Sequence, residues 1–216
     1  MFPHRSKPHT AEHRTPVDST GLTRRALRRV LRTRRRGLSS RKRRVHAGAV
    51  RDLLLPSPLL RGVRNLGAYL AADGEIDPLA LLTGLGDRGI RPWLPCIAPI
   101  PRGPNRLRFR RLQSPQAMRP NRFGIPEPFG TRMRAGWTLD AVLIPLVGFD
   151  RTGARLGMGA GYYDATFDAR RDRPNRPALI GLAHSLQEVT MLDQLPHDAP
   201  LDAIVTEQEV ILPTGH

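Results

Sequence analysis

The chain has very little cysteine and no long apolar segment. Cys96 is the single cysteine among 216 residues, which excludes an internal disulfide framework and a paired-cysteine metal site. No apolar run approaches the ~20 residues that a helix needs to cross a bilayer. The first fifteen residues, MFPHRSKPHTAEHRT, lack the apolar core of a secretory signal. We therefore expect a cytoplasmic protein without membrane contact, long enough for one α/β domain with its own core.

Lysine is also scarce, because only Lys7 and Lys42 occur among 35 basic residues. The formal net charge of +16 is concentrated near the N-terminus. Residues 1–64 carry 18 Lys and Arg against 3 Asp and Glu, whereas residues 65–216 carry 17 against 16. Such a basic segment either binds nucleic acid through phosphates or forms a solvated helical face. The near-neutral remainder favours the second interpretation, so nucleic acid is not expected as a partner.

The N-terminal segment divides into a tail and two predicted helices. Residues 1–22 are polar and without periodicity, which predicts a disordered basic tail before a single domain over 23–216. Thr23 is expected to cap a helix that Gly37 ends, and Ser39 or Ser40 is expected to cap a second helix that continues to Leu55. The inward stripe of that second helix is predicted to be Val45, Ala49 and Leu53.

The rest of the chain alternates between strand and helix patterns. Helical patterns begin at Pro78 and near Tyr162. Runs of strand length are found at 66–70, 91–95, 107–112, 141–147 and 178–183, and the segment 196–207 is expected to end in a short strand. This alternation predicts a Rossmann-like α/β fold, a three-layer α/β/α sandwich around a mostly parallel sheet. In such folds ligands bind beyond the carboxyl ends of the strands.

The stretch LDAVLIPLVGFDRTGARLGMGAGYYD, residues 139–164, carries the strongest functional signal. A buried strand leads through a turn at 150–153 into three glycines at alternate positions, Gly157, Gly159 and Gly161. Backbone without Cβ atoms can approach a ligand closely and turn its N–H groups toward an anion. A helix beginning near Tyr162 would direct its positive end the same way. The spacing matches neither GxGxxG nor the P-loop, but it still predicts a phosphate site.

The string GFDRTGARLGMGAGYYD closely resembles the signature of the 5-formyltetrahydrofolate cyclo-ligase family, whose usual form is close to GFD-x-x-G-x-RLG-x-G-x-GYYD. The run Arg24-Arg25-Ala26-Leu27-Arg28 resembles the Lys/Arg-x-x-Leu-Arg motif of the family's first helix, and the resemblance covers roughly 23–212. Two positions depart from it: Ala160 stands where Gly or Lys is common, and Arg24 stands where Lys is common.

The resemblance implies an enzyme that uses ATP and Mg²⁺ to close 5-formyltetrahydrofolate to 5,10-methenyltetrahydrofolate, releasing ADP and phosphate. Arg28 and Arg155 would then act in catalysis, and Asp164 and Asp198 would bind the metal. The implied ATP-binding residues are Arg24, Arg28, Arg155, Leu156, Gly157, Met158, Gly159, Ala160, Gly161, Tyr162 and Tyr163. The implied substrate-binding residues are Leu70, Glu75, Met158, Gly159, Ala160, Gly161 and Tyr162.

The segment 121–128 resembles a family segment that lies beside the substrate pocket. We expect a monomer whose partner is the small folate substrate. Two alternatives stay open. One is a non-catalytic relative with the same fold, which the departures at Ala160 and Arg24 suggest. The other is an RNA-binding protein that uses the arginine-rich helices.

Overall fold

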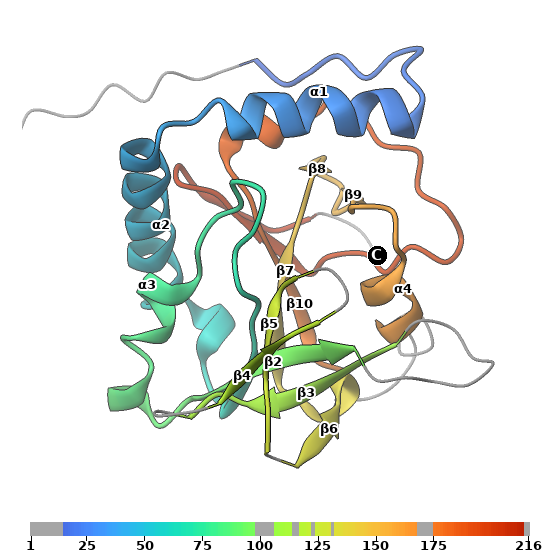
Figure 1. Ribbon diagram of the computed structural model, residues 1–216. Coiled ribbons are helices and arrows are strands. Elements are labelled where there is room, and N and C mark those ends of the chain that lie inside the picture. Colours follow the sequence, from blue (N-terminus) through green and yellow to red (C-terminus); the bar gives the residue numbers. More distant parts are fainter. Residues whose placement is uncertain are drawn as a thin grey trace, which may run out of the picture.

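A mixed eight-stranded sheet forms the centre of the protein (Figure 1). The computed structural model describes residues 15–97, 106–113, 117–121, 124–130, 132–167 and 175–213. The strand order is β12-β11-β10-β7-β1-β2-β3-β6. Strands β1, β2, β7, β10 and β11 are parallel, and β3, β6 and β12 are antiparallel to their neighbours at the two ends. This confirms the predicted α/β class with a mostly parallel sheet.

The sheet strands are β1 (Asn65–Gly67), β2 (Arg91–Ile97), β3 (Leu107–Arg111), β6 (Met133–Ala135), β7 (Ala141–Pro145), β10 (Ala178–Leu182), β11 (Ala203–Val205) and β12 (Val210–Ile211). Two small hairpins lie outside it: β4 (Met118–Pro120) with β5 (Pro126–Pro128), and β8 (Gly148–Phe149) with β9 (Arg155–Leu156). The helices are α1 (Arg24–Arg36), α2 (Ser40–Leu54), α3 (Leu79–Leu82) and α4 (Tyr162–Phe167).

The side chains of β7 alternate between two hydrophobic clusters, one on each face of the sheet. Ala141 and Leu143 pack with residues of α2 and α3, whereas Val142 and Ile144 pack with Phe167 of α4. Successive side chains of a strand point to opposite faces, so a strand with both sets buried must lie between two layers. This arrangement confirms the predicted three layers.

Strands β1 and β7 mark the point where the chain changes direction across the sheet. From β1 the order proceeds through β2 and β3 on one side, and through β7, β10 and β11 on the other. The loops that leave the carboxyl ends of β1 and β7 therefore start side by side at one edge of the sheet, the usual ligand position in this fold class. One of these loops contains Glu75, and the other leads into the glycine stretch.

Helix α1 is drawn across one end of the sheet, above the hairpin of β8 and β9 (Figure 1). Leu27 and Leu31 are buried against Leu156 in a third small cluster. The approach is so close that a Cβ at Gly148 would lie 2.5 Å from Cδ1 of Leu31. Only glycine at this position lets the helix contact the hairpin, and this contact places α1 beside the glycine loop.

The helix caps follow the sequence prediction, but the buried face of α2 does not. Thr23 and Ser39 accept hydrogen bonds from the first turns of α1 and α2, respectively. The predicted stripe in α2 is wrong at Val45, which is 63 % exposed, whereas Leu53 is partly buried and packs against the core. The face that packs on α3 and the sheet instead consists of Ala47, Val50 and Leu54. A helix this rich in arginine offers little periodic contrast, so several registers fit the same sequence.

The predicted tail boundary also needs correction, because residues 15–22 belong to the packed body. Val17 is 8 % exposed, forms an isolated bridge with Val189, and packs in the cluster of Leu27 and Leu31. The Ser19 hydroxyl donates to the carbonyl of Met191 at 2.5 Å. The remainder of the tail prediction, over 1–14, lies outside the described residues. In the described part of the chain, no helix combines the length and apolarity needed to span a membrane.

Candidate active site

Helix α1 directs two arginines of the predicted motif toward the glycine loop and the chain near residue 198. Arg28 donates from Nε to the carbonyl oxygen of Gly157 at 2.8 Å. Arg24, one turn earlier, donates from Nη1 to Asp198 Oδ2 at 3.0 Å and to the carbonyl of Asp193 at 2.8 Å. Burial lowers the pKa of Arg28, and the neighbouring Arg24 cation lowers it further. Two cations placed side by side favour an anion between them.

The loop after β9 is exposed and contains two left-handed glycines. Gly159 has φ of +99° and Gly161 has φ of +69°, a region that other residues rarely adopt. A Cβ on Gly159 would lie 3.5 Å from Cζ of Arg28, so the loop and the guanidinium are adjacent. Met158 is 51 % exposed, and Ala160 is exposed as well. Leu156 differs from the rest of the predicted nucleotide set because its side chain is fully buried, which leaves only its backbone for a ligand.

Arg155 lies beneath this loop and is 5 % exposed. Its guanidinium forms an ion pair with Asp164 and donates from Nε to the carbonyl of Ala199 at 3.1 Å. Burial lowers the pKa of Arg155, and the Asp164 carboxylate opposes that shift. The same Asp164 oxygen accepts from the Ala199 N–H at 3.3 Å. Arg155 thus joins β9, α4 and the segment before β11.

The two predicted metal ligands, Asp164 and Asp198, are connected through Ala199 and its neighbours. Asp198 accepts from Arg24 and from the Leu195 N–H at 3.0 Å, both through Oδ2. Within the described residues, Oδ2 of Asp164 and Oδ1 of Asp198 accept no hydrogen bond. Each carboxylate therefore keeps one hard oxygen of the kind that Mg²⁺ prefers.

Glu75 belongs to the loop after β1. Its carboxylate accepts from the Ala72 N–H at 3.0 Å and lies 3.8 Å from Nη1 of Arg35. Burial raises the pKa of Glu75. Burial also raises the pKa of Tyr163, and the nearby Glu75 carboxylate raises it further. The charge of Glu75 thus influences the predicted nucleotide residue Tyr163, although 88 positions separate them in the sequence.

The remaining predicted residues are partly or fully buried. Leu70 is partly buried at the edge of the core cluster beneath β1. Tyr162 and Tyr163 are partly buried and pack on the cluster of α4. Asp150 is buried and holds its own turn, because it accepts from the N–H of Thr152 at 2.9 Å and from the N–H of Leu192 at 2.8 Å.

Arg35 is a structurally central residue that the sequence analysis did not single out. It is 0 % exposed and donates to the carbonyl of Leu146 at 2.8 Å, to the carbonyl of Asp73 at 2.9 Å and to Asp73 Oδ2 at 2.7 Å. It follows Arg28 by seven positions and Leu31 by four, so it continues the buried face of α1. That spacing was a usable signal, hidden among the many arginines of the helix.

A cavity of about 180 Å³ opens at the carboxyl end of β2. Its lining includes Glu127 and Pro128, which belong to the segment that resembles the family's pocket wall. The Glu127 carboxylate accepts from the Ile97 N–H at 2.9 Å. Cys96 also lines the cavity, where burial raises the pKa of its thiol to about 11 and leaves it unreactive. None of the predicted site residues line this cavity.

The fold and the site define an α/β protein with an arginine-flanked glycine loop above the switch point of a mostly parallel sheet. The model of the 5-formyltetrahydrofolate cyclo-ligase family matches residues 21–207. The chain belongs to this family.

Known proteins of the same kind are similar to the chain over most of its length. The 5-formyltetrahydrofolate cyclo-ligase of Escherichia coli K12 is 32% identical over 183 residues, covering 84% of this chain and 98% of the relative. The enzyme of the same name from Haemophilus influenzae is 35% identical over 65% of this chain and 74% of its own. The solution structure of Aquifex aeolicus 5,10-methenyltetrahydrofolate synthetase superposes with a TM-score of 0.74 at 27% identity, covering 89% of this chain and 94% of the other.

Proposed function

We propose that this protein converts 5-formyltetrahydrofolate to 5,10-methenyltetrahydrofolate with Mg²⁺ and ATP, releasing ADP and phosphate. The observation that carries the proposal is the position of Arg28. It reaches from α1 to the carbonyl of Gly157, and it lies against the left-handed Gly159. A guanidinium joined to a glycine loop provides both the charge and the backbone N–H groups that a triphosphate requires.

The reaction needs an activated formyl group, because a formamide is a poor electrophile and its oxygen leaves poorly. In the proposed sequence the formyl oxygen attacks the γ-phosphorus, the bond to the β-bridging oxygen breaks, and ADP departs. The formyl carbon is now iminium-like, so N10 attacks it and closes the ring. The C–O bond then breaks, phosphate leaves, and the N10 proton passes to solvent.

Phosphoryl transfer asks the protein mainly for positioning and charge neutralisation. We assign Arg24, Arg28 and Arg155 to the phosphate oxygens, with the 156–161 backbone around the triphosphate. Asp164 and Asp198 would hold Mg²⁺, which supplies positive charge against the phosphate oxygens when bound. Glu75, together with Leu70, would hold the folate.

The influence of the Glu75 charge on Tyr163 supports placing the two substrates together. A carboxylate whose charge influences the end of the glycine stretch would lie where the folate meets the γ-phosphate. Tyr162 would contribute a ring face at the same place. Both substrates would then meet at the carboxyl ends of β1 and β7.

The direct experiment mixes the purified protein with Mg-ATP and 5-formyltetrahydrofolate and follows the methenyl-folate absorption band. We expect the band to grow with one ADP and one phosphate formed per product, and to require both ATP and Mg²⁺. Binding of both ligands without turnover would instead establish the non-catalytic relative that Ala160 and Arg24 suggest.

The RNA-binding alternative receives little support from α1. Arg24, Arg28 and Arg35 are engaged inside the molecule, and Arg32 donates to Asp73 at 2.8 Å. RNA affinity would collapse between ~50 and ~200 mM salt, whereas ATP-dependent turnover should change far less over that range.

A further inference from the structure

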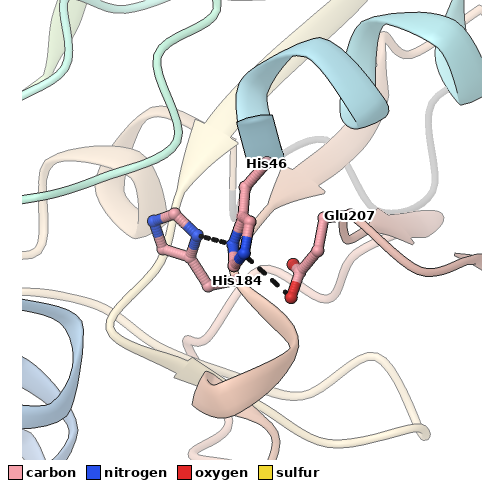
Figure 2. A group of neighbouring side chains, drawn as sticks. All are labelled: His46, His184 and Glu207. Carbon is pink, nitrogen blue, oxygen red and sulfur yellow. Dashed lines mark hydrogen bonds and ion pairs between the residues drawn. The ribbon is translucent and has the colours of Figure 1, made fainter. Parts of the chain in front are cut away.

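Three side chains from distant parts of the chain converge beside the ends of β10 and β11. Figure 2 shows His46 of α2 between His184 and Glu207, with dashed contacts to both. His46 Nδ1 lies 2.9 Å from His184 Nδ1 and 3.5 Å from Glu207 Oε1. All three ligand atoms lie within 4.8 Å of one another, which makes this the one such group of three found in the described part of the chain.

The hydrogen bonds around the group determine which ring nitrogen of His184 carries the proton. His184 Nε2 lies 3.0 Å from the carbonyl of Gly74, and a carbonyl only accepts, so Nε2 carries the proton. The lone pair of His184 is therefore on Nδ1, which accepts from the Nδ1–H of His46 at 2.9 Å. A bound metal ion would replace this hydrogen bond, with the His46 proton moved to Nε2.

The Glu207 carboxylate is also fixed by hydrogen bonds. Its Oε2 accepts from the Ser185 N–H at 2.9 Å, and its Oε1 accepts from the Ser185 hydroxyl at 2.6 Å. Metal-binding sites characteristically have such outer partners: a backbone carbonyl on the second nitrogen of a histidine and a hydrogen bond on a carboxylate. Both kinds of outer partner are present in this group.

The spacing also suits a tetrahedral ion. Two ligands at about 2.0–2.1 Å from one Zn²⁺ lie roughly 3.3 Å apart when the angle between them is tetrahedral. The observed separations of 2.9 and 3.5 Å fall on either side of that value. Small rotations of the His46 side chain would meet it, since this side chain is 18 % exposed and lies at the edge of the group.

We propose that His46, His184 and Glu207 form a binding site for one divalent transition-metal ion, of which Zn²⁺ is the first candidate. Two imidazoles and one carboxylate suit zinc far better than Mg²⁺, which prefers oxygen ligands alone. Three protein ligands leave a fourth position for water. The ion would bridge α2 to the ends of β10 and β11. Through the bond from His184 to Gly74, it would also stiffen the loop that carries Glu75.

The test measures zinc affinity of the full chain after chelator treatment, in buffer with excess Mg²⁺ so that the Asp164 and Asp198 region does not contribute. Competition with a chromophoric chelator should reveal one tight site. Replacing His46 with Gln, or Glu207 with Gln, should weaken it by more than the roughly 10–100-fold that loss of an outer partner costs, whereas Ser185→Ala should fall within that range.

Two further measurements give the site a signature. Co²⁺ added in place of Zn²⁺ should produce the visible absorption of a four-coordinate ion in the wild type and not in His46→Gln. Zinc at about a hundredfold excess over its Kd should raise the Tm by about 5–10 °C in the wild type and have little effect on that variant.

The controls address other histidines. His197→Gln changes an exposed histidine and should leave zinc affinity unchanged. Replacing His4, His9 and His13 together with Gln should also leave it unchanged. Circular dichroism checks that His46→Gln, the most exposed change in the group, keeps the fold. The proposal is overturned if zinc affinity survives in His46→Gln and Glu207→Gln, if it vanishes in the N-terminal triple variant, or if the wild type binds no zinc.

Discussion

Arg28 is the residue on which the proposed nucleotide site depends most. Replacing it with Ala removes the cation beside Gly159 and the hydrogen bond to Gly157. A hydrogen bond to a charged group contributes roughly 1.5–3 kcal/mol, so we expect the apparent KM for ATP to rise at least about tenfold. The measurement is steady-state kinetics with ATP varied at saturating folate.

The matched control for Arg28 is Arg29→Ala, which removes an exposed arginine of the same helix. Arg29→Ala should keep the wild-type Tm, whereas Arg28→Ala should keep the fold with a small loss of Tm, because its hydrogen bond to Gly157 is removed. If ATP kinetics are the same in the two variants, Arg28 serves only the surface of α1 and the phosphate assignment fails.

Substitution of Asp164 can distinguish a role in binding Mg²⁺ from a structural role as the partner of Arg155. Asn at this position cannot supply the negative charge that holds a hard dication, so we predict loss of most Mg²⁺-dependent activity and a shift of the Mg²⁺ requirement to higher concentration. The variant should also lose about 1–3 kcal/mol of stability, because buried Arg155 loses its partner carboxylate but keeps the Ala199 carbonyl. Mg²⁺ titration of the rate and thermal unfolding together measure the two effects.

The exposed Asp193→Asn provides the control for charge removal near the site, and its Mg²⁺ curve should be unchanged. Asp198→Asn should cause a smaller loss than Asp164→Asn, since Arg155 stays paired. A destabilised Asp164→Asn protein with a wild-type Mg²⁺ curve would show that the carboxylate serves Arg155 alone.

At the scale of the helix, Arg35 connects α1 to the segments that follow β1 and β7. Arg35→Met keeps the volume but removes three buried hydrogen bonds. The Asp73 carbonyl loses its donor, whereas the Leu146 carbonyl keeps Gln187 and the Asp73 carboxylate keeps Arg32. Breaking a buried pair in this way costs about 3–5 kcal/mol. We expect this loss in the free energy of unfolding measured with urea.

The same substitution at Arg36 gives the comparison. Arg36 also pairs with Asp73, but its side chain is 58 % exposed, so Arg36→Met should change the free energy of unfolding by no more than about 0.5 kcal/mol. Equal losses of unfolding free energy at the two positions would mean that the buried hydrogen bonds of Arg35 add no more stability than the exposed ion pair of Arg36.

At the scale of the whole molecule, the N-terminus provides a test of where the body begins. Deletion of residues 1–14 should leave the Tm unchanged, because their sequence offers little apolar surface. Deletion of 1–20 removes buried Val17 and the Ser19 hydrogen bonds, which together contribute about 2–4 kcal/mol. Thermal unfolding of the two truncated proteins compares them, and equal Tm values would restore the earlier boundary at residue 22.

The sequence by itself determined the features that depend on neighbouring residues. The α/β class follows from apolar runs alternating with helical patterns, and the ends of α1 follow from Thr23 and Gly37. The glycine stretch was recognisable because its residues are consecutive, and the same continuity gave the family resemblance that the family model confirms.

Only the tertiary structure decided which side chains meet across distant elements. The face of α2, the burial of Arg35 and the packing of Val17 depend on what lies opposite, and a local pattern carries no record of its neighbours in space. The group of His46, His184 and Glu207 is the clearest case, because its members come from one helix and the ends of two strands. Parallel strands bring their carboxyl ends to one edge of the sheet, so the topology assembles such groups from residues whose sequence separation gives no sign of contact.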